Sequence, residues 1–202
     1  PYRSTTAASS GMGEIMNCPD CSSPREHIIR SADEMYVPTE MRPAGLFAWV
    51  LRCWECGRNE SGYTTLTFRP VTIDDTQLLY NWRNDPETRE HSFNQHPLEH
   101  TQHEMWVKIN LTVFANQTSV LWLIGMIGDT PVGSILINLF SDPMEINIMV
   151  APEFRGSGLG TAMLALAPIP AGTRGRVKGT NPASVWAFYR AGWKMQEIVY
   201  VK

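Results

Sequence analysis

The run Arg155-Gly156-Ser157-Gly158-Leu159-Gly160 decides the fold of this chain of 202 residues, because of what stands on either side of it. The apolar residues 146–150 precede it and predict a strand that ends before Pro152. The Ala-, Leu- and Met-rich residues 161–167 follow it and predict a helix. Glycines let a backbone approach a ligand closely, and the unpaired first N–H groups of a helix favour an anion. The run therefore predicts a phosphate-binding turn, and the alternative is a plain strand–helix turn without a ligand.

This run lies in a longer pattern that resembles a known family. Val150-x-Pro152-x-x-Arg155-Gly156-x-Gly158-x-Gly160 is similar to the acetyl-CoA signature of the GNAT superfamily of N-acetyltransferases. Thr67-Phe68-Arg69-Pro70 and Trp82-Arg83-Asn84-Asp85 look like the opening strand and helix of GNAT enzymes that acetylate amino-sugar nucleotides or protein N-termini. Asn181-Pro182-Ala183-Ser184, Phe188-Tyr189 and Gly192-Trp193 look like the family's C-terminal segment. The resemblance covers roughly residues 64–202.

The resemblance implies an α/β (α+β) fold, with a mixed, twisted GNAT-like sheet flanked by helices. The hydrophobic patterning predicts elements in the same order. We expect strands over residues 63–69, 119–127, 132–140, 146–150, 174–179 and 194–201, and helices over residues 72–83, 98–109, 161–167 and 183–191. Residues 128–131 predict a hairpin, Thr72–Asp75 a helix cap, and Thr101 with Glu104 a capping box.

The four cysteines form two C-x-x-C pairs in the first third of the chain, Cys18 with Cys21 and Cys53 with Cys56. A two-residue spacer lets both thiolates of a pair face one ion, so the pattern predicts a structural zinc site. Disulfides, free thiols or a redox-active pair are the alternatives. We therefore expect a disordered leader at residues 1–15, a zinc-ribbon module at 16–62 that ends in a linker at 59–62, and the acetyltransferase domain at 63–202.

Charge is divided unevenly along the chain. Residues 151–202 hold seven basic and two acidic side chains, whereas residues 63–150 hold four basic and ten acidic ones. The basic end suits a cofactor with a pyrophosphate and a 3′-phosphate, and the acidic part suits a cationic acceptor. The alternative is two unrelated solvated surfaces. No secretion signal or membrane-spanning stretch is present, which predicts a cytoplasmic protein without a membrane partner.

The resemblance assigns roles to individual residues. Ile148, Met149 and Val150 are expected to offer backbone groups to pantetheine, and Arg155, Gly156, Ser157, Gly158, Leu159 and Gly160 to hold the pyrophosphate. Asn181 and Ser184 are expected near the far end of acetyl-CoA. The family often places an acidic tyrosine where this chain has Phe188, so Tyr189 is the candidate acid, with a packing or surface role as the alternative. Glu145 is the candidate base, and an exposed strand-end carboxylate is the alternative.

The histidine-rich region around His100 and His103 leaves its role open. Spaced three residues apart, the two side chains share a helix face, where they would bind a metal or act as bases. A solvated helix surface is the alternative, and it is the one we favour. Trp82, Trp106 and Trp122 are expected in the core.

These observations predict an acetyl-CoA-dependent N-acetyltransferase that acts on a primary amine by direct attack. The amine belongs to an amino-sugar nucleotide, a protein or peptide, or another small molecule. One alternative is an enzyme that modifies a nucleic-acid base and is guided by the zinc ribbon. Residues 1–62 have six basic and eight acidic side chains, and this negative balance disfavours binding to nucleic-acid phosphates. The other is a non-catalytic regulator that binds acyl-CoA or nucleic acid. The end of the chain soon after Trp193 indicates strand exchange in a homodimer.

Overall fold

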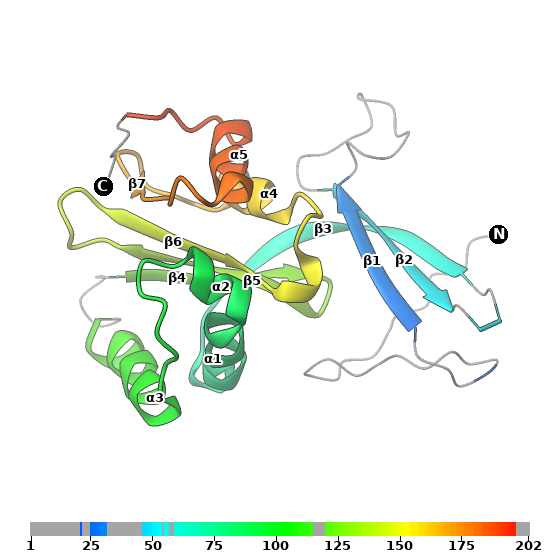
Figure 1. The fold of residues 1–202 in the computed structure, drawn as a ribbon, viewed down its shortest axis with the longest axis horizontal. Coiled ribbons are helices and arrows are strands. Elements are labelled where there is room, and N and C mark those ends of the chain that lie inside the picture. The colour runs from blue at the N-terminus through cyan, green and yellow to red at the C-terminus, as the bar shows by residue number, and fades with distance from the viewer. Residues whose placement is uncertain are drawn as a thin grey trace.

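The computed structural model describes residues 21, 25–31, 46–53, 55–56, 59–114 and 120–196. A mixed sheet in the order β1-β2-β3-β4-β5-β6-β7 runs through this part of the chain (Figure 1). Neighbouring strands are antiparallel from β1 to β6, whereas β6 and β7 are parallel. The strands are β1 (Arg25–Ser31), β2 (Leu46–Cys53), β3 (Asn59–Pro70), β4 (Val120–Ile127), β5 (Thr130–Asn138), β6 (Glu145–Val150) and β7 (Arg174–Gly175).

Strand β3 joins the two ends of this sheet. Its first part pairs with β2, where Thr65 lies opposite Leu46, and its last part pairs with β4, where Leu66 lies opposite Ile127. The linker predicted at residues 59–62 is wrong, because these residues form the start of β3. The boundary predicted after residue 62 therefore falls inside one continuous strand.

Helices cover both faces of the five strands β3–β7. In the described part of the chain, the α-helices between β3 and β4 lie on one face and those after β6 lie on the other (Figure 1). The helices are α1 (Thr76–Asn84), α2 (Pro86–His91), α3 (His100–Ile109), α4 (Leu159–Leu166) and α5 (Pro182–Arg190), with short helical turns at Ile73–Asp75, Asn110–Phe114 and Pro152–Phe154. None of the helices in the described part of the chain is long and apolar enough to cross a membrane.

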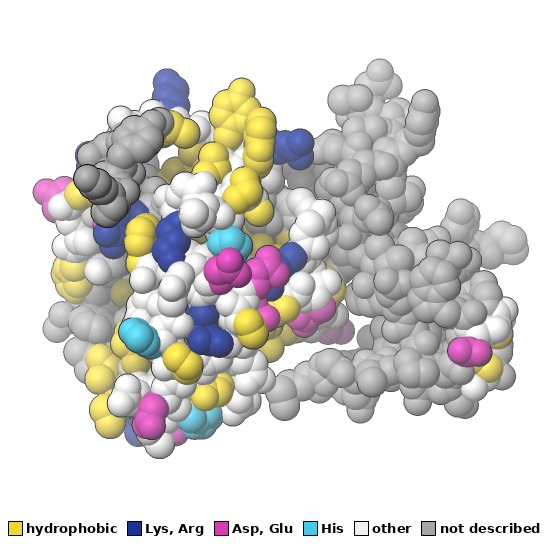
Figure 2. All heavy atoms as spheres, viewed as in Figure 1, with side chains coloured by type: hydrophobic (Ala, Val, Ile, Leu, Met, Phe, Trp, Pro, Cys, Tyr) yellow, Lys and Arg dark blue, Asp and Glu magenta, His cyan; other side chains and the backbone are white. Residues whose placement is uncertain are grey.

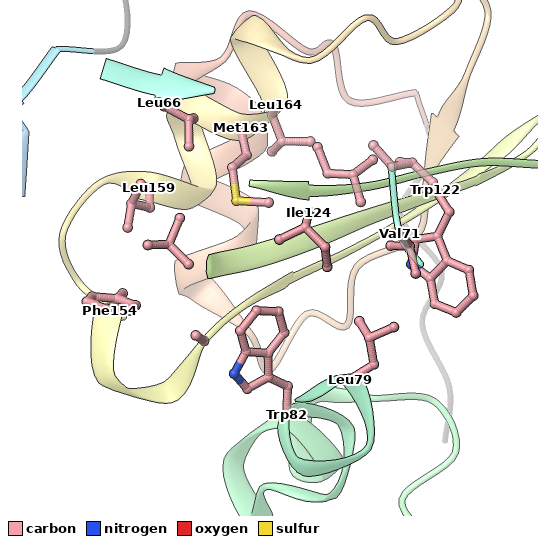
Figure 3. Packing of buried hydrophobic residues seen from close by; sticks show 14 of the residues in the cluster. Leu66, Val71, Leu79, Trp82, Trp122, Ile124, Phe154, Leu159, Met163 and Leu164 are labelled. Carbon is pink, nitrogen blue, oxygen red and sulfur yellow. The ribbon is translucent and has the colours of Figure 1, made fainter. Parts of the chain in front are cut away.

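The core lies on both sides of the central strands. Leu79 and Trp82 of α1 pack below Ile124 of β4, while Met163 and Leu164 of α4 pack above it (Figure 3). Complete burial of such side chains stabilises the fold by about 1.5–3 kcal/mol each. This packing fixes α4, and with it the glycine turn at its start, against the sheet. The expectation that Trp82 is a core residue is confirmed.

Several predicted boundaries need correction. The hairpin between β4 and β5 and the cap at Thr72 and Asp75 are confirmed. The capping box at Thr101 is wrong, since α3 begins at His100 with Glu99 as its N-cap. Helix α2 was not predicted, although Asp85 caps its first turn and Pro86 stands at a helix-starting position. Residues 194–196 form no strand, and residues 197–202 of the predicted last strand lie outside the described residues.

Candidate active site

The parallel strands β6 and β7 separate after two residue pairs. Glu145 pairs with Arg174 and Ile146 pairs with Gly175, and the ladder ends there. The other edge of β6 stays paired with β5 as far as Val150, opposite Gly133. The backbone of Ile148 to Val150 therefore faces a wedge between β6 and β7, where no strand of the described residues pairs with it. An extended ligand is able to add to such an edge through backbone hydrogen bonds.

The glycine turn follows directly on this open strand. Gly156 and Gly158 have φ angles of +74° and +81°, in the left-handed region that glycine adopts most readily. Gly158 is the N-cap of α4 and has no side chain to bond the first N–H groups of that helix. These donors and the positive end of the helix dipole make an anion site at the mouth of the wedge. Helix α4 itself has only eight residues, about two turns.

The side chains of the glycine turn make contacts within the protein and do not form a ligand-binding surface. The Ser157 hydroxyl is buried and donates to the Phe154 carbonyl over 2.6 Å. Leu159 is buried in the core, and a Cβ added at Gly160 would make ordinary contacts with Val150 and Ala187. The Arg155 guanidinium points away from the turn toward α2. A phosphate at this turn would thus meet backbone N–H groups.

Helix α5 lies beside α4. Asn181 is the N-cap of α5, and its Oδ1 accepts the Ser184 backbone N–H over 3.0 Å. The Cβ of Ala187 packs close to Gly160 at the start of α4. The two predicted residues are therefore brought together, in a helix cap whose helix borders the glycine turn.

The two candidate catalytic residues lie in different surroundings. Glu145 begins β6 and pairs with Arg176, with 3.2 Å between Oε1 and Nε. Tyr189 lies on α5 with 68% of its surface exposed, and its ring meets the ring of Trp186 edge-on. Phe188, at the position where the resemblance expects tyrosine, packs against Trp193 and over Gly175 of β7. The roles of Glu145 and Tyr189 stay predictions.

About half of the chain matches a known protein family. Residues 65–168, from β3 through α4, match the model of the "Acetyltransferase (GNAT) domain". The chain belongs to the GNAT acetyltransferase family. The match contains the open strand, the glycine turn and α2. No curated protein matches the chain.

Solved structures of GNAT enzymes share the fold. Aminoglycoside acetyltransferase AAC(6′)-Ib, in complex with coenzyme A and kanamycin, is 20% identical with a TM-score of 0.55, and the match covers 67% of this chain and 87% of that one. Spermidine N-acetyltransferase from Vibrio cholerae, with CoA and spermine, is 19% identical with a TM-score of 0.54, covering 63% and 79%. The acetyltransferase yncA from Salmonella typhimurium, described as putative and solved with acetyl-CoA, is 15% identical with a TM-score of 0.53, covering 65% and 81%.

On the α1–α3 side, the GNAT domain holds a buried histidine. His103 is 6% exposed, and its Nε2 has no hydrogen-bond partner among the described residues. Its ring lies against Tyr80 and Trp106. Burial lowers the pKa of His103, and the nearby positive charges of His100 and Arg83 lower it further. The solvated surface that we favoured is thus wrong for His103, whereas His100 is exposed and bonds Gln77 over 2.9 Å.

The predicted zinc ligands are only partly described. Cys18 lies outside the described residues, Cys53 is described by its backbone at the end of β2, and Cys21 and Cys56 are exposed. Within the described residues no three His, Cys, Asp or Glu side chains are grouped to hold a metal ion. The zinc site stays a prediction.

The described part of the chain also has a cavity away from the glycine turn. A cavity of about 340 Å³ lies between the last turns of α4 and α5, lined by Leu164, Ile169, Ala191 and Trp193. It is at the opposite end of both helices from the glycine turn, so we do not assign acetyl-CoA to it. Basic and acidic side chains are intermixed on the face in Figure 2. Arg155 and Arg176 are each ion-paired with a carboxylate in the fold. Charge alone therefore does not mark the cofactor side of the molecule.

Proposed function

We propose that this GNAT domain transfers the acetyl group of acetyl-CoA to a primary amine by direct attack. The observation that carries the proposal is the open edge of β6 leading into the glycine turn at the start of α4. Backbone groups of Ile148, Met149 and Val150 are suited to pantetheine, and the backbone N–H groups of residues 155–160 to the pyrophosphate. Asn181 and Ser184, at the start of α5, are proposed to lie near the far end of acetyl-CoA.

The reaction needs a neutral amine and a polarised thioester carbonyl. The amine nitrogen attacks the carbonyl carbon, the C–S bond breaks, and the products are an amide and CoA. One proton leaves the amine and one joins the CoA thiolate. Glu145 is the proposed acceptor of the first and Tyr189 the proposed donor of the second. Backbone N–H groups on the open edge of β6 are positioned to stabilise the developing oxyanion.

The acceptor is proposed to be a small polyvalent amine. The support is that the similar structures include enzymes solved with kanamycin and with spermine, and that residues 63–150 carry ten acidic and four basic side chains. Four of those acids are ion-paired in the fold, which leaves the rest available to attract a cationic acceptor. Amino-sugar nucleotides and peptide amines are the other acceptor classes to be compared.

Two measurements test the proposal. A ligand that binds only the folded protein at about a hundred times its Kd stabilises it by about 2.7 kcal/mol, so acetyl-CoA is expected to raise Tm by several degrees. Release of CoA is then followed with spermidine, kanamycin, an amino-sugar nucleotide and a peptide. Absence of any shift with acetyl-CoA would refute the enzyme proposal. A shift without CoA release from any amine would favour the regulator.

We further propose that Cys18, Cys21, Cys53 and Cys56 bind one zinc ion. Arg25 pairs with Cys53 in the antiparallel ladder of β1 and β2. The start of β1, four residues after Cys21, therefore lies at the same end of this hairpin as Cys53 and the turn that contains Cys56. Metal analysis of the intact chain is expected to give one zinc per chain, lost in Cys21→Ser and in Cys56→Ser. A chain that binds no zinc would refute this, and salt-resistant binding of duplex DNA would favour the nucleic-acid alternative.

A further inference from the structure

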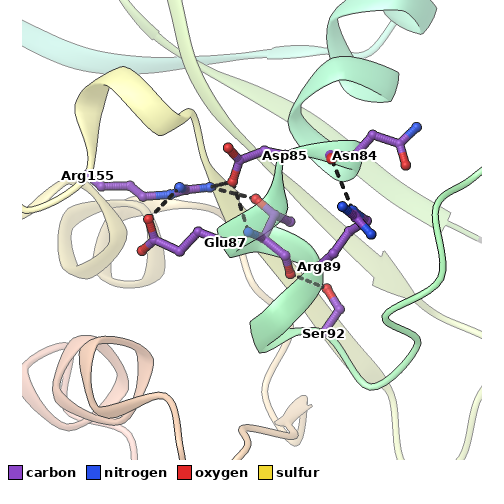
Figure 4. A network of polar contacts seen from close by, with 7 residues as sticks. Asn84, Asp85, Glu87, Arg89, Ser92 and Arg155 are labelled. Carbon is purple, nitrogen blue, oxygen red and sulfur yellow. Dashed lines mark hydrogen bonds and ion pairs between the residues drawn. The ribbon is translucent and has the colours of Figure 1, made fainter.

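The first turn of α2 is joined to the glycine turn by Arg155. Its Nη2 lies 2.6 Å from Asp85 Oδ2 and donates to Thr88 Oγ1 over 2.6 Å, while its Nη1 lies 2.9 Å from Glu87 Oε2 (Figure 4). Both terminal nitrogens of the guanidinium are thus engaged by α2, which lies 67 to 70 residues earlier in the chain. Such charge-assisted contacts of an arginine fork fix both direction and distance.

The Asp85 carboxylate has two tasks in this contact. Its Oδ2 accepts the Thr88 backbone N–H over 2.9 Å, which caps α2, and it also receives Arg155. Burial by itself raises the pKa of Asp85, but the hydrogen bonds from Thr88 and Arg155, with the charge of Arg155, outweigh burial and lower it. The Arg155 side chain is 25% exposed and that of Asp85 is 20% exposed, so the pair is partly shielded from water.

The far end of the same segment is held by two more basic residues. We call residues 85–93 the α2 segment. Lys178 donates to the Glu90 carbonyl over 3.0 Å, and the Arg176 guanidinium lies 5.2 Å from the centre of the Phe93 ring. Arg176 also pairs with Glu145, the first residue of β6, whereas Arg155 comes shortly after the last. The α2 segment therefore runs along β6 from the end of that strand back to its start.

We propose that Arg155 is a positioning residue that fixes the α2 segment to the glycine turn, and that its side chain is not a phosphate ligand. This rests on the proposed function, since it makes the α2 segment the acceptor wall of the wedge that holds acetyl-CoA. The backbone of Arg155 belongs to the phosphate turn while its guanidinium sets the distance from that turn to the acceptor wall. Loss of the Asp85 carboxylate is then expected to have the same effect on the α2 segment as loss of the Arg155 guanidinium.

The test is a double-mutant cycle in the full chain with Arg155→Gln, Asp85→Asn and both together. Asparagine also caps helices well, so Asp85→Asn removes the ion pair and keeps the cap. Arg190→Gln, a charge change at an exposed residue near the end of α5, is the matched control. Each variant is compared for hydrogen exchange of residues 86–91, for affinity toward CoA and toward pantetheine, and for the KM of acetyl-CoA and of the best amine from the panel.

We expect Arg155→Gln and Asp85→Asn each to speed exchange of residues 86–91 by about tenfold, with no further gain in the double variant, because the two residues form one contact. The KM of the amine is expected to rise by about tenfold while the KM of acetyl-CoA stays within about threefold. The ratio of CoA to pantetheine affinity is expected to stay at the wild-type value. Arg155→Lys keeps the charge and loses the forked geometry of the guanidinium. Its hydrogen-exchange rate at residues 86–91 is therefore expected to lie between those of the wild type and Arg155→Gln.

The opposite results are equally specific. Suppose that Arg155→Gln lowers the affinity for CoA by tenfold or more and leaves the affinity for pantetheine unchanged, whereas Asp85→Asn changes neither affinity. Then Arg155 binds phosphate and the proposal is wrong. Unchanged exchange of residues 86–91 in both variants also overturns it. Failure of the wild-type chain to bind CoA would instead refute the proposed function, and the exchange measurements would still decide whether Arg155 holds α2.

Discussion

Replacement of Gly156 by alanine isolates the contribution of the glycine turn. Gly156 has a φ of +74°, and a Cβ added there meets no atom within 4 Å. Gly128, in the hairpin between β4 and β5, has a φ of +58° and equally open surroundings. Gly156→Ala and Gly128→Ala therefore impose the same kind of backbone strain without a steric clash. Only the first change lies in the proposed phosphate site.

The size of the strain follows from the left-handed conformation. An L-residue in this region costs about 1–2 kcal/mol relative to glycine, so both variants are expected to lose about 1 kcal/mol of unfolding free energy. For a domain of this size that loss corresponds to a fall in Tm of about 2–4 °C. If residue 156 relaxes toward negative φ, the N–H groups of the turn rotate away from the ligand. We expect a loss of CoA affinity of about tenfold in Gly156→Ala alone.

Urea unfolding and calorimetric titration with CoA measure the two effects separately. Two results contradict the reasoning: an equal loss of CoA affinity in Gly128→Ala, and wild-type affinity in Gly156→Ala at the expected loss of stability. The first would mean that general destabilisation weakens binding. The second would mean that the turn is a plain strand–helix connection whose N–H groups do not meet the cofactor.

Three further changes test the fold and the chemistry. Asp75→Asn breaks two 2.7 Å contacts with Arg69 and is expected to cost about 1–2 kcal/mol in urea at pH 7, since Arg69 is part-exposed. Burial raises the pKa of Asp75, but the hydrogen bonds from Arg69 and Thr72 lower it overall, so this stabilisation should disappear as pH falls below about 4. Burial lowers the pKa of His103; stability should therefore fall as pH drops below about 6.5, and His103→Gln should flatten that decline in urea titrations. Tyr189→Phe is expected to lower kcat by about a hundredfold, since Tyr189 is the proposed donor of the proton to the CoA thiolate, and a kcat within about threefold of the wild-type value would exclude that role.

The elements around the glycine turn were predictable because local rules agree with tertiary packing there. An apolar run, a proline, glycines and an Ala/Leu/Met run each favour one conformation, and no long-range contact opposes them. Helix α2 was predictable in principle, because Asp85 and Pro86 are strong helix-start residues. The helix predicted over residues 72–83 ends just before Asn84-Asp85-Pro86, and the same residues also start the next helix.

Long-range contacts decided the features that the sequence did not reveal. The direction of the Arg155 side chain depends on carboxylates about 70 residues away, so no local pattern indicates it. Strand β7 has two residues instead of the six expected, because the chain after Gly175 turns to bring Arg176 to Glu145 and Lys178 to α2. Basic residues that we expected to pair with cofactor phosphates thus hold the α2 segment instead.

The position of Phe188 links the shape of the wedge to the chemistry. A Cβ built on Gly175 would overlap Cε1 of Phe188 and would lie 2.5 Å from its Cζ, so the ring edge sits directly over the strand. Glycine at 175 therefore leaves room for the Phe188 ring, and this contact holds β7 close to α5 where β7 diverges from β6. Because Phe188 has no hydroxyl, it cannot supply the proton that the proposed reaction delivers to the CoA thiolate, and that proton must come from another group or from water.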